Sequence, residues 1–282
     1  MFTNATILDK SPLPWMASPK DFSGSNNLGV AAKETTQRYI YGTRYMTWDG
    51  KVFKYGHAAV VCQSGYGARN YAGVNISHAL PAAPVTTTVG QTTLVVTVDS
   101  NDGYSAASLT GGSGIVAENE LVGGYVVVGN NLESPENFTI MGNTAVASGG
   151  GTTILTLDRP MSIAYTGSTD YCEVLYNPYA HLAGNTVNDN YFSVMGVPAT
   201  QVTAAYNSWF QTWGPLWLTP TGAAQPGSTA SDREFYFLQQ NGAIVSGTTA
   251  VVETGWQRGG FIIEWDAAGA AGPPFCMLQL SI

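Results

Sequence analysis

The sequence predicts an all-β protein, a β-barrel or β-sandwich body with an inserted small β module and an extended N-terminal arm. Only 11% of the 282 residues are charged, compared with about 25% in an average soluble domain, so few helices with a solvated face are expected. Runs of β-branched and aromatic residues recur at intervals of roughly 8–12 residues, which is typical of barrels and sandwiches. The 33 glycines and other turn-forming residues separate these runs.

Three parts are expected along the chain. An extended arm covers residues 1–37, the body combines residues 38–84 and 185–282, and the inserted β module covers residues 85–184. Prolines in the arm remove backbone donors and push the preceding residues out of the helical region. The best helix candidate in the arm, Val30–Gln37, has only about two turns and is too short to be stable alone.

The strand predictions begin with a hairpin. Tyr39–Trp48 is aromatic and β-branched, Asp49–Gly50 supplies a type I′ turn, and Lys51–Tyr55 returns. In the module, Thr92–Val98 and Gly151–Asp158 share a Thr-Thr-apolar pattern, and they either pair or only share β-propensity. The other predicted strands are Gly123–Gly129, as a strand buried on both faces, Phe138–Met141, Tyr191–Val197, Val202–Ser208, Trp209–Leu218, Phe235–Leu238, Gly242–Val245, Gly260–Trp265 and Phe275–Leu280.

Positive charge is concentrated near the start of the chain. Eight of the eleven lysines and arginines lie in the first seventy residues together with four acids, whereas the other 212 residues hold three arginines and fifteen acids. This split indicates a basic arm attached to an acidic body, unless the excess of acids is a chance feature of a solvated face. Apolar side chains in an arm without its own core can be buried only against another molecule. The residues expected to make that contact are Lys10, Trp15, Lys20, Phe22 and Lys33.

Several classes of function are disfavoured. The first six residues lack a charged segment followed by an apolar run, so no secretory signal is expected, and no apolar stretch approaches the ~20 residues of a membrane helix. The cysteines Cys62, Cys172 and Cys276 form no CxxC pair, so we expect buried reduced thiols and neither a metal nor a cofactor. An acidic body without lysine after Lys54 repels phosphate, which disfavours nucleic acid.

Catalytic and metal-binding motifs are weak. The chain has no GxSxG, HExxH, GxxxxGK or GxGxxG motif. His57, His78 and His181 are far apart in sequence and have no acid at ligand spacing, so they are expected to pack or cap. Asp99–Gly103 is similar to the start of a calcium loop, but Thr110 stands where a bidentate glutamate is required. A turn capped by its own Asp and Asn side chains is therefore expected.

Two pairs of acids could serve a glycoside hydrolase. Glu118 with Glu120 and Glu264 with Asp266 are each two residues apart, which would place both members on one face of a strand. Like charges that close would raise the pKa of one carboxyl group, as a general acid requires. Acids two residues apart on an edge strand are common and mostly solvated. We therefore expect that the protein is not an enzyme.

Trp209, Trp213 and Trp217 fall at even spacing in one predicted strand. An exposed row of tryptophans would suit stacking on sugar rings, whereas a buried row would belong to the core or to a subunit interface. We expect core or interface, because large aromatic side chains are usually buried. Gly214–Pro215 interrupts the ladder, so Trp217 can switch to the opposite face.

Four segments occur in a suggestive order: Gly123–Val128 (GGYVVV), Leu155–Pro160, Asn177–Tyr179, and Tyr206–Pro215, which contains WFQTWGP. This succession resembles a family of tailed-bacteriophage virion proteins, the capsid decoration or cement proteins and related head proteins. The resemblance covers roughly residues 85–218 and depends on short structural motifs.

The resemblance implies an all-β structural protein that forms a homotrimer and binds the outside of an assembled shell. The implied partners are the major capsid protein and further copies of the chain. The implied location is the capsid surface of the virion, reached from the host cytoplasm during assembly. The alternative function is that of a glycan- or receptor-binding virion module of the fibre or adhesin type.

Overall fold

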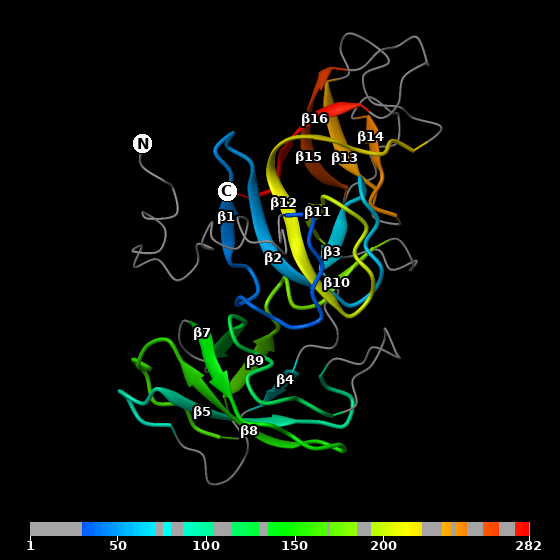
Figure 1. The fold of residues 1–282 in the computed structure, drawn as a ribbon. Coiled ribbons are helices and arrows are strands. Elements are labelled where there is room, and N and C mark those ends of the chain that lie inside the picture. The colour runs from blue at the N-terminus through cyan, green and yellow to red at the C-terminus, as the bar shows by residue number, and fades with distance from the viewer. Residues whose placement is uncertain are drawn as a thin grey trace, which may run out of the picture. The chain divides into compact units, whose positions relative to one another are not determined.

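The protein is all-β, as the sequence predicted. The structure, a computed structural model, describes residues 30–70, 76–79, 87–103, 114–129, 135–167, 170–184, 193–221, 233–238, 241–246, 256–264 and 274–281. Within these ranges every regular element is a strand, and the chain divides into two compact units (Figure 1). Unit 1 consists of residues 1–71 and 178–282, and unit 2 of residues 72–177.

Unit 1 contains a closed barrel. Its described strands follow one another in the order β2 (Val52–Ala58), β10 (Leu182–Ala183), β3 (Ala68–Asn70), β11 (Val194–Pro198) and β12 (Tyr206–Trp217). The ring closes because β2 pairs with β10 on one side and with β12 on the other. Strand β1 (Arg44–Met46) adds to β2 outside the ring. Buried side chains fill the interior, among them Ala58, Cys62, Leu182 and Phe210.

Among the described residues, the same ten-stranded sheet continues beyond the barrel, and its second part, named the second sheet, shares β12 with the barrel. From β12 it continues through β16 (Phe275–Gln279), β15 (Gln257–Glu264), β13 (Glu234–Phe237) and β14 (Ile244–Ser246). The chain just after β12 returns to β14, where the Ile244 N–H donates to the Thr219 carbonyl and the Thr221 N–H donates to the Ile244 carbonyl, each at 3.0 Å. The sheet is therefore nearly closed, around a core that includes Phe235, Phe237, Ile262 and Leu278.

Unit 2 is a nearly closed barrel of antiparallel strands. Their order is β4 (Ile76–Ala79), β9 (Tyr171–Leu175), β6 (Tyr125–Gly129), β7 (Glu136–Asn143), β8 (Gly151–Leu157) and β5 (Thr93–Val98). The first and last strands in this order, β4 and β5, also contact each other. The two strands with the Thr-Thr-apolar pattern do pair, with Leu94 opposite Leu155, and both leucines are fully buried.

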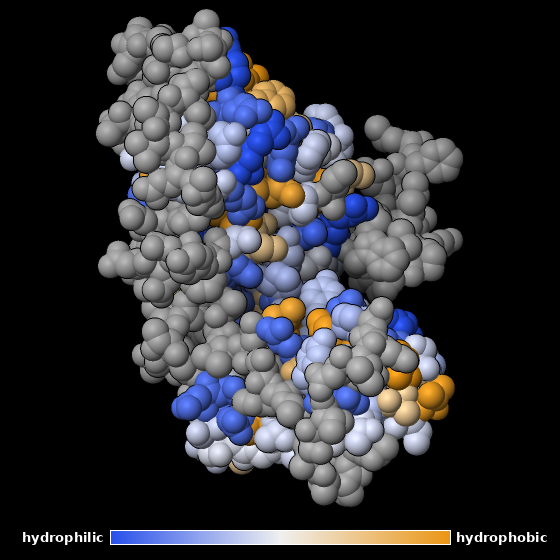
Figure 2. All heavy atoms as spheres, turned by 180° about the vertical axis from the view of Figure 1, so that it is seen from behind, coloured by the Kyte–Doolittle hydropathy of each residue, from blue (hydrophilic) through white to orange (hydrophobic). Residues whose placement is uncertain are grey.

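Some side chains of unit 2 face outward although they are apolar. Strand β6 was predicted to be buried on both faces, but while Val126 and Val128 are buried, Val127 is only half-buried and Tyr125 is 46% exposed. Met141 and Tyr171 are exposed to a similar extent. Figure 2 shows apolar side chains at the surface of the protein in the view from behind. The strand is thus buried on one face, as expected for an antiparallel sheet with a solvated side.

The predicted hairpin is present, but its turn differs. Strands β1 and β2 pair with Met46 opposite Val52, and the Thr47 N–H bonds to the Lys51 carbonyl at 2.9 Å. Three residues therefore lie between Thr47 and Lys51, the last bonded pair, and Gly50 has a φ of 81°. This is a three-residue loop with glycine in the left-handed position rather than a two-residue type I′ turn.

The predicted limits of the inserted module need correction. The units divide near residues 71 and 177, whereas the predicted limits were 84/85 and 184/185. Residues 76–79 form β4, which pairs with β9 and thus belongs to unit 2, and residues 182–183 form β10, which pairs with β2 and β3 of unit 1. The predicted limits differ because long-range strand pairing, not local composition, assigns a segment to a unit.

Candidate functional site

The described end of the N-terminal arm is attached to the start of β12. The Ser208 hydroxyl donates to the Ala32 carbonyl at 2.7 Å. Glu34 and Asn207 form an antiparallel bridge, in which their backbone N–H groups donate to each other's carbonyls at 2.9 and 2.7 Å. Ser208 and Asn207 are buried. Residues 30–34 are therefore part of the structure of unit 1.

This attachment replaces the helix predicted for Val30–Gln37, which is wrong: the segment contains turns, bends and the bridge at Glu34. A helix of two turns satisfies few of its own backbone groups, and the edge of β12 offers partners instead. Val30 also packs on the cluster formed by Phe53, Tyr55 and Trp209.

The predicted arm contacts can be placed only in part. Lys10, Trp15, Lys20 and Phe22 lie outside the described residues. Lys33 is exposed, next to the bridge that holds Glu34.

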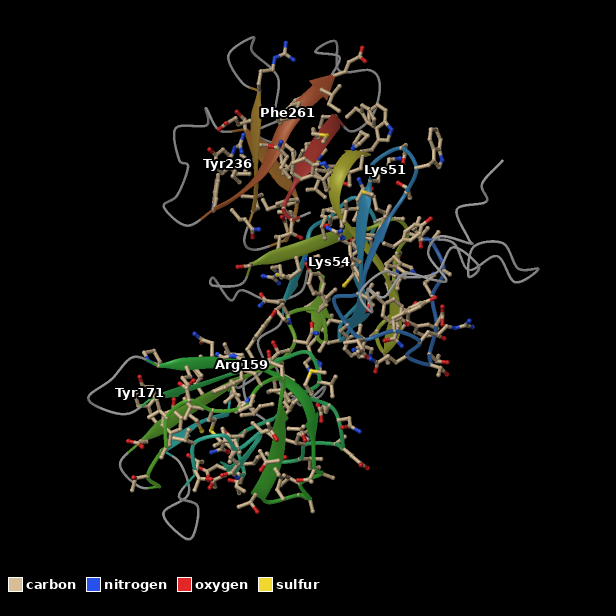
Figure 3. The ribbon with its side chains drawn as sticks, turned by 90° about the vertical axis from the view of Figure 1, so that its left-hand side faces the viewer. Lys51, Lys54, Arg159, Tyr171, Tyr236 and Phe261 are labelled. Atoms are coloured by element: carbon tan, nitrogen blue, oxygen red, sulfur yellow. The ribbon has the colours of Figure 1, made fainter. Side chains whose placement is uncertain are left out.

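Counting charges by segment corrects the expectation of a basic arm. Residues 1–37 hold three cations and three acids, whereas residues 38–70 hold five cations and one acid. The positive surplus thus belongs to the first strands of unit 1, where Arg44 lies opposite Lys54 across β1 and β2. Lys54 (Figure 3) stands over the Tyr179 ring at 5.4 Å, and burial, then the charge of Arg44, lowers its pKa.

Unit 2 carries the net charge of the chain. It holds nine acids and a single cation, Arg159, whereas unit 1 holds ten of each sign. The Arg159 guanidinium (Figure 3) lies 3.6 Å from Glu136 and 4.5 Å from the centre of the Phe138 ring. Burial raises the pKa of Glu136, but hydrogen bonds from Ser162 and Tyr165 outweigh it and lower this pKa overall.

The three tryptophans do not form one row. Trp209 is 3% exposed and belongs to the aromatic cluster with Tyr55, Trp213 is partly buried, and Trp217 is 56% exposed. The regular alternation of β12 is interrupted at Gly214, which has a φ of 102° and approaches Lys51 closely. Trp217 therefore presents its side chain to solvent at the end of β12.

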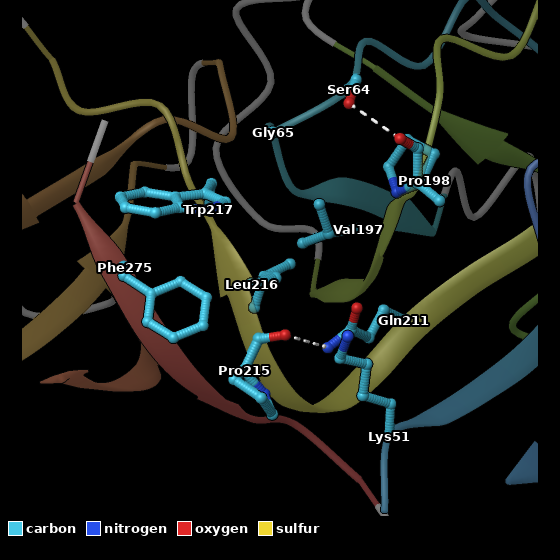
Figure 4. A pocket seen from close by; sticks show the side chains of 11 residues that line it. Lys51, Ser64, Gly65, Val197, Pro198, Gln211, Pro215, Leu216, Trp217 and Phe275 are labelled. Carbon is cyan, nitrogen blue, oxygen red and sulfur yellow. Dashed lines mark hydrogen bonds between the residues drawn. The ribbon is translucent and has the colours of Figure 1, made fainter. Parts of the chain in front are cut away.

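Trp217 forms one wall of a pocket of about 390 Å³ (Figure 4). Its ring lies 4.9 Å from that of Phe275, with an interplanar angle of 43°, since the two residues are direct partners on β12 and β16. Val197 and Leu216 add apolar surface, and polar groups come from Gln211 of β12 and from Lys51 and Ser64, which lie outside this strand.

The polar side chains of the pocket are held in place. The Gln211 amide nitrogen donates to the carbonyls of Trp213 and Pro215 at 3.1 and 3.2 Å. The Ser64 hydroxyl donates to the Ala199 carbonyl at 3.1 Å, and the Lys51 ammonium lies 3.2 Å from Asp49. The pocket could not be predicted from the sequence, apart from the glycine–proline interruption before Trp217, because its residues come from separate segments of the chain.

Two histidines that are far apart in sequence meet in unit 1. The rings of His57 and His181 lie 6.3 Å apart at 88°, and Nδ1 of His57 is 3.1 Å from the Ala180 carbonyl. Burial, then the nearby His57, lowers the pKa of His181 to about 3, and burial also lowers the pKa of His57. His78 lies in β4.

The acidic candidates that the structure describes lie in a turn or at the end of a strand. Glu118 and Glu120 lie in a turn rather than on one face of a strand, and Glu120 accepts the Ala117 N–H at 2.6 Å. Burial raises the pKa of Glu120. Glu264 ends β15, and Asp266 lies outside the described residues.

The turn predicted at residues 99–103 is present, and an Asp side chain caps it. The Asp99 N–H donates to the Asp102 carboxylate at 2.7 Å, and the Asp102 N–H donates to the Asp99 carbonyl at 3.0 Å. Among the described residues, no group of three or more His, Cys, Asp or Glu side chains is placed to hold a metal ion.

The three cysteines are free and buried, as predicted. In the described ranges, no helix has the length and apolar character that crossing a membrane requires. No protein-family model matches the chain, and no similar protein was found among curated proteins or solved structures. The resemblance to phage decoration proteins therefore stays a prediction.

Proposed function

We propose that the protein is a structural virion protein that decorates the outside of a tailed-phage head. Its partners are the major capsid protein and further copies of itself in a homotrimer, and it catalyses no reaction. The proposal is carried by one observation, the attachment of residues 30–34 to β12 through the Glu34–Asn207 bridge. Residue 30, to which the preceding 29 residues are joined, therefore has a fixed place on unit 1.

The length of the arm suits a contact that spans neighbouring shell subunits. At about 3.3 Å per residue, 29 extended residues reach about 95 Å, and the prolines of this segment favour an extended chain. Trp15 and Phe22 are two of the large apolar side chains in this segment. Burying each contributes about 1.5–3 kcal/mol.

The proposed contact between the arm and the shell depends on apolar surface rather than on net charge. Lys10 follows Asp9 directly, and Lys20 precedes Asp21, so each arm lysine has an acid as its chain neighbour. Neighbouring charges of opposite sign contribute little to attraction between the arm and the shell at distances beyond the Debye length of about 8–10 Å. Binding to the shell should accordingly change little between low and moderate salt.

The attachment also explains how the arm would hold a shell together. Tension on the arm passes through the backbone bonds of Glu34 into Asn207 and thus into β12, which takes part in both sheets of unit 1. A pull on the arm is then resisted by the whole unit rather than by a loop.

The test is cosedimentation with empty heads of the phage that encodes the chain. The full chain and a variant without residues 1–29 are compared, since this deletion leaves the bridge at Glu34 intact. We expect the shortened protein to keep its circular dichroism spectrum and melting temperature and to lose binding. The double variant Trp15→Ala/Phe22→Ala should lose most of the binding.

Trp48→Ala is the matched control, because Trp48 is 92% exposed on the β1–β2 hairpin and does not belong to the arm. Undiminished binding of the shortened protein would overturn the proposal. Steep loss of binding with added salt would overturn the apolar mechanism but not the attachment itself. Sedimentation equilibrium of the free protein tests the homotrimer.

A further inference from the structure

The wall formed by Trp217 and Phe275 has the properties of a stacking platform. More than half of the Trp217 side chain is exposed, although burying an aromatic ring of this size is strongly favourable. Its backbone position is fixed by the pairing of β12 with β16. An exposed, rigid aromatic face of this kind can receive a flat apolar surface at little cost in conformational entropy.

The other side of the pocket is polar. Lys51 supplies an ammonium group, Ser64 a hydroxyl and Gln211 an amide, around the small apolar patch of Val197 and Leu216 (Figure 4). The amide nitrogen of Gln211 is used by two backbone carbonyls, and within the described part of the chain its oxygen receives no hydrogen bond. This oxygen can accept a hydrogen bond from a ligand hydroxyl.

From this geometry we propose that the pocket binds a neutral pyranose ring of a glycan. One face of a pyranose is made of C–H groups and packs on an aromatic ring, while its edge carries hydroxyls that match the amide, hydroxyl and ammonium groups opposite. The volume of about 390 Å³ is near the lower end of ligand pockets, which span roughly 300–1,000 Å³. It suits a short saccharide rather than a folded segment of a protein.

The charge of the pocket favours a neutral sugar over an anion. Among the described residues that line the pocket, Lys51 is the single cation, and Asp49 lies 3.2 Å from its ammonium group. Phosphate or carboxylate recognition normally uses a bidentate arginine or several unpaired donors. The site does not depend on attachment to a shell, so the two proposals can fail separately.

The test begins with an array of neutral pyranose oligosaccharides and their uronic acid counterparts, followed by isothermal titration calorimetry of the glycans that bind. We expect saturable binding of at least one neutral glycan. Trp217→Ala should weaken it about ten-fold or more, and Trp217→Phe less, since an aromatic face remains. Calorimetry does not depend on the fluorescence of the replaced tryptophan.

Trp48→Ala is again the control, because it removes a more exposed tryptophan that does not line the pocket. It should leave binding unchanged, and Trp217→Ala should still cosediment with heads. The proposal is overturned by absence of binding across the array, by equal binding of Trp217→Ala, or by tighter binding of the acidic counterparts.

Discussion

The buried histidine pair predicts how the stability of unit 1 depends on pH. His181 is 8% exposed, and its ring faces that of His57. Burial, then the charge of His57, lowers the pKa of His181 from 6.5 to about 3. Between these two values the unfolded chain binds a proton that the folded chain does not, so stability present above pH 6.5 is lost as the pH falls toward 3.

The size of the effect follows from this difference. One proton bound only by the unfolded chain costs about 1.4 kcal/mol for each pH unit. Between pH 6.5 and 4.5 His181 should therefore cost about 2.7 kcal/mol, a large part of the roughly 5–15 kcal/mol that stabilises a typical domain. The pKa of His57 is lowered as well, so it acts in the same direction.

The variant His181→Gln removes the titrating group and keeps a polar side chain. Urea unfolding at several pH values between 4.5 and 7.5 gives the free energy of unfolding of both proteins. We expect the difference between them to shrink or reverse as the pH falls, by about 2–3 kcal/mol over two units. Carboxyl groups titrate in both proteins and cancel in the difference. Parallel curves would refute the reasoning.

Three further predictions concern packing. Gly242→Ala places a Cβ 2.2 Å from the Gly67 carbonyl oxygen at a φ of 68°, so the free energy of unfolding should fall by more than the about 1–3 kcal/mol of backbone strain alone; an unchanged urea midpoint would contradict this. Leu155→Ala should destabilise unit 2 by about 2–5 kcal/mol in thermal unfolding, whereas exposed Thr156→Ala should cost much less. Burial raises the pKa of each of the three cysteines to about 12, so a thiol reagent at pH 8 should react only after denaturant is added; rapid labelling of the folded protein would show that a thiol is accessible.

The sequence predicted the fold class and most strands because alternation is a local property. Thr93–Val98 and Gly151–Leu157 bury every second side chain, and a periodicity of two is visible without knowledge of the partner. The limits of the units were not visible in the same way. Strands β4 and β10 have four and two residues, and such short segments belong to a sheet only through their partners.

The functional features were less predictable than the strands. The even spacing of the three tryptophans is real, but the φ of 102° at Gly214 redirects the chain before Trp217, and composition alone does not fix that angle. The meeting of His57 and His181 depends on the parallel pairing of β10 with β2, a contact between residues more than a hundred positions apart. The attachment of Glu34 depends on the free edge of β12 near Asn207, which exists only after the barrel has formed.

Strand β12 contributes to both proposed contacts, the arm attachment and the pocket. It holds the arm at Asn207 near its start, contributes Gln211 and Trp217 to the pocket near its end, and takes part in both sheets of unit 1. It pairs with β2 as far as Trp213, and from Trp213 onward it pairs with β16. The arm is thus attached to the half of β12 that belongs to the closed barrel, and Trp217 lies in the half that belongs to the second sheet. Asn207 and Trp217 lie on opposite sides of Gly214, whose φ is 102°, so replacing the Trp217 side chain should leave the backbone bonds between Glu34 and Asn207 in place.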